Sequence, residues 1–134
     1  MGQPNRSIVR TTLAGLSGLL LIGAEAPSAL APALPGIWEV GRSATGADAR
    51  QSCIVEPIAL SQWEHRGARC TRVIIADSSN KAVIHYTCAD GGFVRSEMTL
   101  VTPRSIKIAT QGISQAGPFS YTLHARRIGN CAPR

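Results

Sequence analysis

Apolar and polar residues alternate along most of the chain from Gly36 onward, which is the spacing of half-buried β-strands. Residues that favour turns separate the alternating segments, so the pattern predicts strands at about 36–43, 50–55, 69–77, 81–89, 92–102, 105–111 and 118–128. The connections are too short for the crossovers that parallel strands need. We therefore predict a mainly β fold, an antiparallel meander of six or seven strands that forms a curved sheet or a small open barrel.

One segment, EPIALSQWEH, interrupts the alternation. Pro57 suits the first turn of a helix, and Leu60 and Trp63 follow three residues apart. This spacing predicts one short helix at about 56–65. In the final strand, every second side chain points to the same face of the sheet. This alternation places Phe119, Tyr121, Leu123 and Ala125 on the core face and Arg126 on the opposite face.

The N-terminal region has the pattern of a secretory signal peptide. Arg6 and Arg10 precede an apolar run, and Ala29 and Ala31 occupy the −3 and −1 positions of a small-residue cleavage site. We predict a signal peptide at 1–31, helical at about 7–24 and cleaved after Ala31. The chain would then be periplasmic, with no stable membrane anchor after cleavage.

The rest of the chain would consist of three parts. We expect an Ala/Pro linker at 32–35, a single β-rich domain at 36–131 and a tail at 132–134. The formal net charge of +6 would favour anionic partners, but the basic residues are scattered along the chain, which is typical of a soluble surface. Nucleic acid is not expected as a partner, because aromatic residues do not interleave with the basic ones.

All four cysteines follow the predicted cleavage site, and an even number in an oxidising compartment predicts two disulfides. If residues 78–80 form a three-residue loop, Cys70 faces Cys88 across a hairpin at disulfide distance. Cys53 would then pair with Cys131. Pairing of Cys53 with Cys70, and of Cys88 with Cys131, remains the alternative.

The sequence contains no compact catalytic or metal-binding motif. His65, His85 and His124 lie far apart along the chain, and the cysteines lack the close pairs typical of zinc sites. A glycosidase-like site would need two paired carboxylates. The spacing of the candidates in the sequence does not indicate such a pair; they are Glu39, Glu56, Glu64 and Glu97. We predict no catalytic residue, no metal site and no cofactor.

The segments PGIWEV, HYTC and ARRIGNC resemble the domain-of-unknown-function family 3617, small exported proteins of Gram-negative bacteria. The resemblance covers about residues 35–131 and implies a periplasmic β-rich domain without an established activity. Gly36-x-Trp38 with a basic residue on the last strand is also similar, more weakly, to the lipocalin barrel closure. That similarity implies that Arg127 packs on or near Trp38.

The resulting functional expectation is an exported β domain with a non-catalytic role, in ligand binding or in support of the cell envelope. The partner would be a small apolar or amphipathic ligand or an envelope component. One alternative is a lipocalin-like carrier of a small apolar ligand, and a second is a small periplasmic hydrolase. An apolar cavity of about 300 Å³ or more would favour binding.

Overall fold

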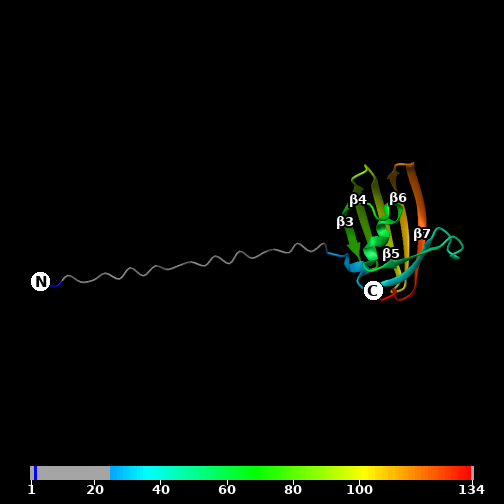
Figure 1. The fold of residues 1–134 in the computed structure, drawn as a ribbon, viewed down its shortest axis with the longest axis horizontal. Helices are drawn as coiled ribbons and strands as arrows, with labels where there is room; N and C mark the ends of the chain where they lie inside the picture. The colour runs from blue at the N-terminus through cyan, green and yellow to red at the C-terminus, as the bar shows by residue number, and fades with distance from the viewer. Residues whose placement is uncertain (1, 3–24, 134) are drawn as a thin grey trace.

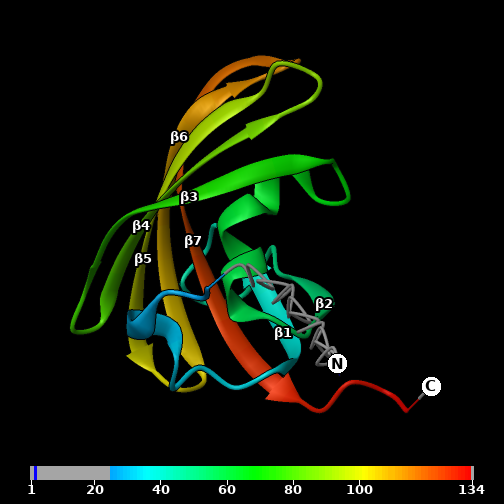
Figure 2. The same ribbon diagram turned by 90° about the vertical axis from the view of Figure 1, so that its left-hand side faces the viewer.

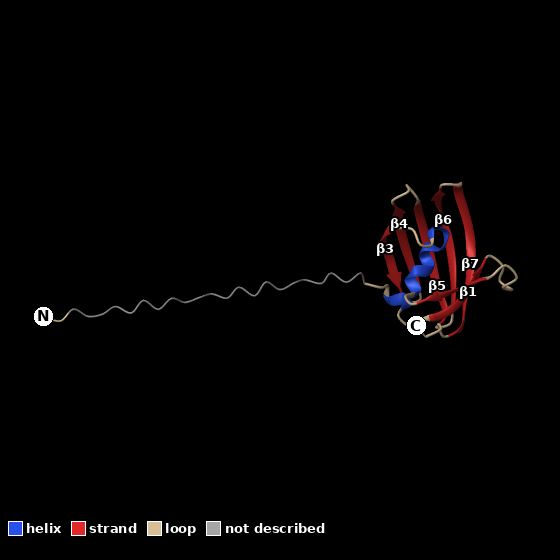
Figure 3. Cartoon of the chain, viewed as in Figure 1, coloured by secondary structure: helices blue, strands red, loops and turns tan. Residues whose placement is uncertain are grey.

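The structure is a computed structural model that describes Gly2 and residues 25–133. The described chain forms one antiparallel sheet of seven strands in the order β2-β1-β7-β6-β5-β4-β3 (Figures 1 and 3). The strands are β1 (Gly36–Gly41), β2 (Arg50–Ile54), β3 (Cys70–Ser78), β4 (Lys81–Cys88), β5 (Phe93–Thr102), β6 (Ser105–Ser114) and β7 (Gly117–Gly129). The prediction of a mainly β antiparallel sheet is confirmed.

The sheet curves around the segment η2 (Pro57–His65), as Figure 2 shows. Strands β3 to β7 form a meander because short turns join them, and β7 pairs with β1. The two edges, β2 and β3, leave the sheet open, and η2 connects them along the chain. The sheet therefore has an opening between these two edges.

The segment η2 lies where a short helix was predicted, but it is a 3₁₀-helix with a kink at Gln62. Pro57 occupies its first turn, where the missing N–H costs no hydrogen bond. On the sheet side, the Ser96 hydroxyl donates to the Ser61 carbonyl at 2.7 Å.

Within the described residues, none of the helices is both long and apolar enough to cross a membrane. The signal-peptide helix predicted at 7–24 lies outside the described residues.

A second 3₁₀-helix, η1 (Ser28–Leu30), precedes the first strand and packs into the core. It lies at the end of the predicted signal peptide (1–31), just before the predicted linker (32–35). Leu30 is only 3% exposed, and Ala33 is also buried. Asp77 of β3 accepts hydrogen bonds from the backbone N–H groups of Ser28 and Ala29 at 2.6 and 2.8 Å.

These contacts make the segment before residue 36 an ordered part of the domain. The Leu34 N–H donates to the Pro103 carbonyl, and the Leu34 carbonyl accepts from the Trp38 indole at 3.1 Å. Burial of the Leu30 side chain stabilises the fold by about 1.5–3 kcal/mol. The short apolar segment was missed as core because its composition also fits the end of a signal peptide.

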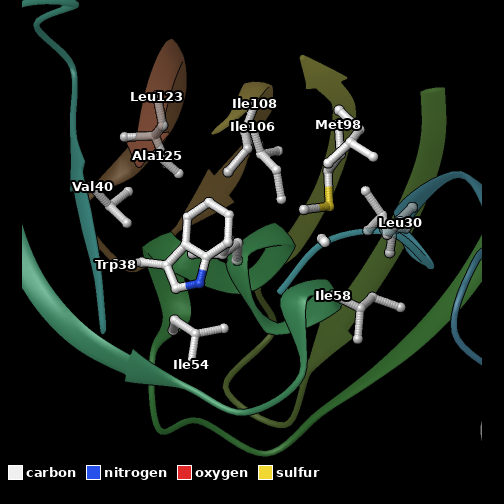
Figure 4. Packing of buried hydrophobic residues seen from close by; sticks show 14 residues of the cluster. Leu30, Trp38, Val40, Ile54, Ile58, Met98, Ile106, Ile108, Leu123 and Ala125 are labelled. Carbon is white, nitrogen blue, oxygen red and sulfur yellow. The ribbon is translucent and has the colours of Figure 1, made fainter. Parts of the chain in front are cut away.

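The core fills the concave side of the sheet and is centred on Trp38, which is fully buried (Figure 4). Side chains from six strands and both 3₁₀-helices surround the indole, among them Leu30, Val40, Ile58, Met98, Ile108 and Leu123. On β7, Leu123 and Ala125 are buried as the alternation predicted, and Tyr121 packs against the same cluster. The core face of the last strand was therefore correctly predicted.

The hairpin β3–β4 shows how the register is maintained. Cys70 faces Cys88 and Val73 faces His85, as predicted, but the turn has two residues, since Ser78 pairs with Lys81. A β-bulge between Ile74 and Ala76 absorbs the one-residue difference. The predicted three-residue loop is wrong, whereas the pairing of the two cysteines that it implied is correct.

Both predicted disulfides are present. Cys70 is bonded to Cys88 within the β3–β4 hairpin, and Cys53 is bonded to Cys131, which is 78 residues away in the sequence. The second bond joins the edge strand β2 to the segment after β7. It therefore fastens the C-terminal segment beside the start of η2.

Candidate functional site

Trp38 and Arg127 face each other in the register of β1 and β7. Arg127 uses its Nε atom to donate to the Pro35 carbonyl at 2.7 Å, and its Nη2 atom to donate to the Asn130 side chain. Among the described residues, the arginine side chains stacked on aromatic rings are Arg42 and Arg66. Arg127 therefore lies opposite Trp38 and fixes the chain entering β1 by hydrogen bonds.

The three histidines are separated in the fold as in the sequence. His85 packs edge-on against Phe93, and His124 lies half-buried on β7. His65 is buried at the end of η2, where its Nδ1 atom lies 3.0 Å from the Tyr86 hydroxyl. A side chain at Gly92 would bring its Cβ to 2.5 Å from His65 Nε2, so only glycine fits there.

His65 also lies near Cys88 and Asp90, with the potential ligand atoms within 4.8 Å of one another. Cys88 is bonded to Cys70, so its sulfur is not the thiolate that binds zinc. The His65 Nε2 atom is buried and makes no hydrogen bond in the described structure. In this oxidised form the cluster is best described as a packed junction between η2 and the β3–β4 hairpin.

A polar cleft next to η2 contains Tyr121, Glu64 and Arg42 and has a volume of about 440 Å³. The Tyr121 hydroxyl donates to the Glu64 carboxylate, and the Arg42 guanidinium stacks over the Tyr121 ring at 4.0 Å. Burial and the neighbouring Glu64 raise the pKa of Tyr121 far above its ordinary value. Tyr121 therefore stays protonated at neutral pH and acts as a hydrogen-bond donor.

A larger groove of about 700 Å³ follows the opening between β2 and β3. We call it the arginine groove, because Arg66, Arg69 and Arg72 line it, with Trp63 and Gln62 of η2. None of these three arginines forms a salt bridge with any other residue in the described part of the chain. Its lining residues include no aspartate or glutamate, so the groove is positively charged.

The turn between η2 and β3 positions two of these arginines. The side-chain amide of Gln62 donates to the carbonyls of His65 and Ala68, both at 3.0 Å, and thereby closes the turn. Gly67 adopts φ 75°, which favours glycine. Arg66 stacks over the Trp63 ring at 3.9 Å. The cationic side chains are therefore held at the groove by a defined turn.

A second cavity, which we call the apolar pocket, has a volume of about 610 Å³. It lies between the segment 25–35, the start of η2 and the edge strand β3, and most of its lining side chains are apolar: Leu30, Ala33, Val55, Ile58, Val73 and Ile74. Glu25 and Glu56 also line it. A pocket of this size and lining can accommodate a small organic molecule.

Arg72 lines both the arginine groove and the apolar pocket. The two cavities are therefore neighbours along β3, on either side of the segment that leads from β2 into η2. An amphipathic molecule could place an apolar chain in the pocket and an anionic group at Arg72. Repulsion from Glu56, which lines the pocket, would favour placing the anionic group at Arg72 rather than inside the pocket.

Sequence reasoning did not identify this site. Arg66, Arg69 and Arg72 were treated as part of a scattered basic surface, and residues before 36 as outside the domain. The close spacing of the three arginines around the start of a strand was the available signal. It was weak, because a charge run usually indicates a solvated surface.

Comparisons with known proteins place the chain in a family and suggest no activity. Residues 33–131 match the model of a family described as "Protein of unknown function (DUF3617)". No curated protein and no solved structure matches the chain. The match covers the whole sheet, both disulfides and most of the two cavities. The chain therefore belongs to the DUF3617 family.

Proposed function

We propose that this chain is an exported periplasmic domain that binds a small amphipathic anion without transforming it chemically. The observation that carries the proposal is the shared position of Arg72 between a positively charged groove and an apolar pocket. The volume of about 610 Å³ exceeds the minimum of about 300 Å³ that is typical of ligand sites. The N-terminal pattern of basic, apolar and small residues, together with two disulfides, supports export.

The charge of the site supports an anionic rather than a neutral ligand. Arg72 and the neighbouring Arg66 and Arg69 are not neutralised by salt bridges among the described residues. A carboxylate or phosphate group can form paired, charge-assisted hydrogen bonds with a guanidinium. The apolar chain would meanwhile remove hydrophobic surface from water, in the pocket that Leu30 and Ile58 help to form.

Binding of dodecanoate and of dodecan-1-ol to the purified exported protein tests this proposal, because the two probes share a chain and differ in charge. We expect dodecanoate to bind about tenfold more tightly, corresponding to about 1.4 kcal/mol. Arg72→Gln should remove this preference and leave dodecan-1-ol binding unchanged. Arg104→Gln, at an exposed turn outside the two cavities, is the control and should leave both affinities unchanged.

The apolar half of the site is tested separately. Val55 lines the apolar pocket and is 68% exposed, so Val55→Asp should preserve the fold and weaken both probes. Native mass spectrometry of the exported protein would show whether a small molecule is retained. Failure to bind either probe, with no retained molecule, would contradict the proposal and favour a role in envelope support.

A further inference from the structure

The segment from Pro27 to Ala33 is fastened to the domain at several points. Pro27 is buried, Ala29 and Leu30 belong to the core, and the Asp77 carboxylate accepts two backbone N–H groups of η1. The Ala33 N–H donates to the Leu30 carbonyl at 2.9 Å, which continues the turn into the segment before β1. Cleavage after Ala31 would remove η1 from the folded protein.

Cleavage after Ala31 would also open the apolar pocket. Leu30 lines that pocket together with Ile74 of β3 and Ile58 of η2. Without Leu30, part of the apolar lining would be lost, and the core cluster to which Leu30 belongs would be opened to water. The contacts of η1 are those of a part of the mature domain rather than those of a leader that is discarded.

We infer that the leader is removed on the N-terminal side of Pro27, at the small-residue sequence Ala24-Glu25-Ala26. This inference rests on the proposed export. For cleavage after Ala26, Ala24 and Ala26 supply the A-x-A pattern that leader-processing peptidases recognise, as Ala29 and Ala31 do for cleavage after Ala31. Cleavage after Ala24 would also have a small residue at −1, with Ile22 at −3. Cleavage after Ala24 or after Ala26 leaves η1 and its Asp77 contacts intact.

The reaction is hydrolysis of one peptide bond by the leader-processing peptidase of the exporting cell. Water adds across the C–N bond, leaving a carboxylate on the leader and an amino group on Glu25 or Pro27. No other bond changes. The family match begins at residue 33, eight residues after Glu25 and six after Pro27, so either product keeps the whole matched region.

Expression of the full chain in an exporting bacterial host, followed by intact mass measurement of the periplasmic protein, tests the inference. A first residue at Glu25 or Pro27 is the expected result. A first residue at Pro32 would overturn the inference and leave the proposed export intact. An exported chain that keeps its leader would also overturn it, whereas a chain retained in the cytoplasm would refute the export and the inference together.

Two variants of the full chain locate the cleaved bond independently. Ala24→Arg combined with Ala26→Arg replaces the small residues at both expected positions and should abolish processing. Ala31→Arg replaces an exposed residue at the other position and should leave the mature mass unchanged apart from the substitution. The reverse pattern, with processing lost only in Ala31→Arg, would place the cleavage after Ala31.

Discussion

Arg126 and Arg127 are adjacent in the sequence but differ in their structural roles. Arg126 is on the outer face and forms an exposed salt bridge with Glu39 at 3.0 Å. Arg127 is half-buried and donates to the Pro35 carbonyl, which fixes the chain just before Trp38. Neighbouring side chains on a strand point to opposite faces, so this difference follows from their position in β7.

We expect Arg127→Ala to lower the free energy of unfolding by about 1–2 kcal/mol, because the Pro35 carbonyl loses a charged donor. Arg126→Ala should change it by less than about 0.5 kcal/mol, as is usual for exposed ion pairs. Urea denaturation of the two variants measures both values. Equal effects would show that the hydrogen bond to Pro35 contributes little.

Asp77 is a second residue whose role depends on a distant segment. The backbone N–H groups of Ala29 and Ser28 hold the pKa of Asp77 below its ordinary value. A lowered pKa in the folded state means that the ionised carboxylate stabilises the fold above the ordinary pKa, and that this contribution is lost as the pH falls through the lowered value.

Asp77→Asn should therefore lower the melting temperature at neutral pH, and the difference from the unmodified protein should shrink as the pH is lowered below about 4. Thermal melts followed by circular dichroism at a series of pH values measure this difference. Asp77→Glu is the charge-matched control. A difference that stays constant with pH would rule out the ionised carboxylate as the group that holds η1.

At the scale of elements, η2 is fastened to the concave side of the sheet by a buried polar contact. The Ser96 hydroxyl on β5 donates to the Ser61 carbonyl and lies 3.1 Å from the Thr110 hydroxyl of β6. The Ser61 hydroxyl itself is buried without a hydrogen-bond partner among the described residues. Removal of the Ser96 hydroxyl and removal of the Ser61 hydroxyl should therefore change the stability of the domain in opposite directions.

Ser96→Ala should destabilise the domain by about 1–3 kcal/mol, because it leaves the buried Ser61 carbonyl without its donor. Ser61→Ala should be neutral or stabilising, because it removes a buried hydroxyl that makes no hydrogen bond. Chemical denaturation of both variants compares them directly. A loss of stability in Ser61→Ala similar to that in Ser96→Ala would indicate a bound water at the Ser61 hydroxyl.

At the scale of the whole molecule, the Cys53–Cys131 bond joins residues 78 positions apart and ties the C-terminal segment to the edge strand β2. A bond that closes a loop of this length is worth about 4 kcal/mol in the chain-entropy model. Domains of this size have a total stability of about 5–15 kcal/mol. The bond is therefore a large part of what keeps β2 in the sheet.

Cys53→Ser combined with Cys131→Ser should lower the melting temperature by more than about 10 °C. Cys131→Ser alone should leave Cys53, which is exposed, free to react with a thiol reagent in the folded protein. Cys70 and Cys88 should remain unreactive in the same sample. A Cys53 that stays unreactive in the folded protein would contradict the disulfide assignment.

Local alternation and turn residues were enough to predict the strands, the position of η2 and the core face of β7. The Cys70–Cys88 pair could also be derived, since it lies within one hairpin, although the bulge that preserves its register could not. Bulges depend on packing across the sheet, which a local pattern does not encode.

Two features became apparent only in the folded chain: η1 packs into the core, and three arginines lie beside an apolar pocket. Asp77 meets Ala29 across 48 residues of sequence. The arginine groove needs β2 and β3, which are at opposite edges of the sheet, to be separated by η2. Such contacts between distant segments form only when the sheet curves, so hydrophobic periodicity, which reports on neighbours in sequence, cannot predict them.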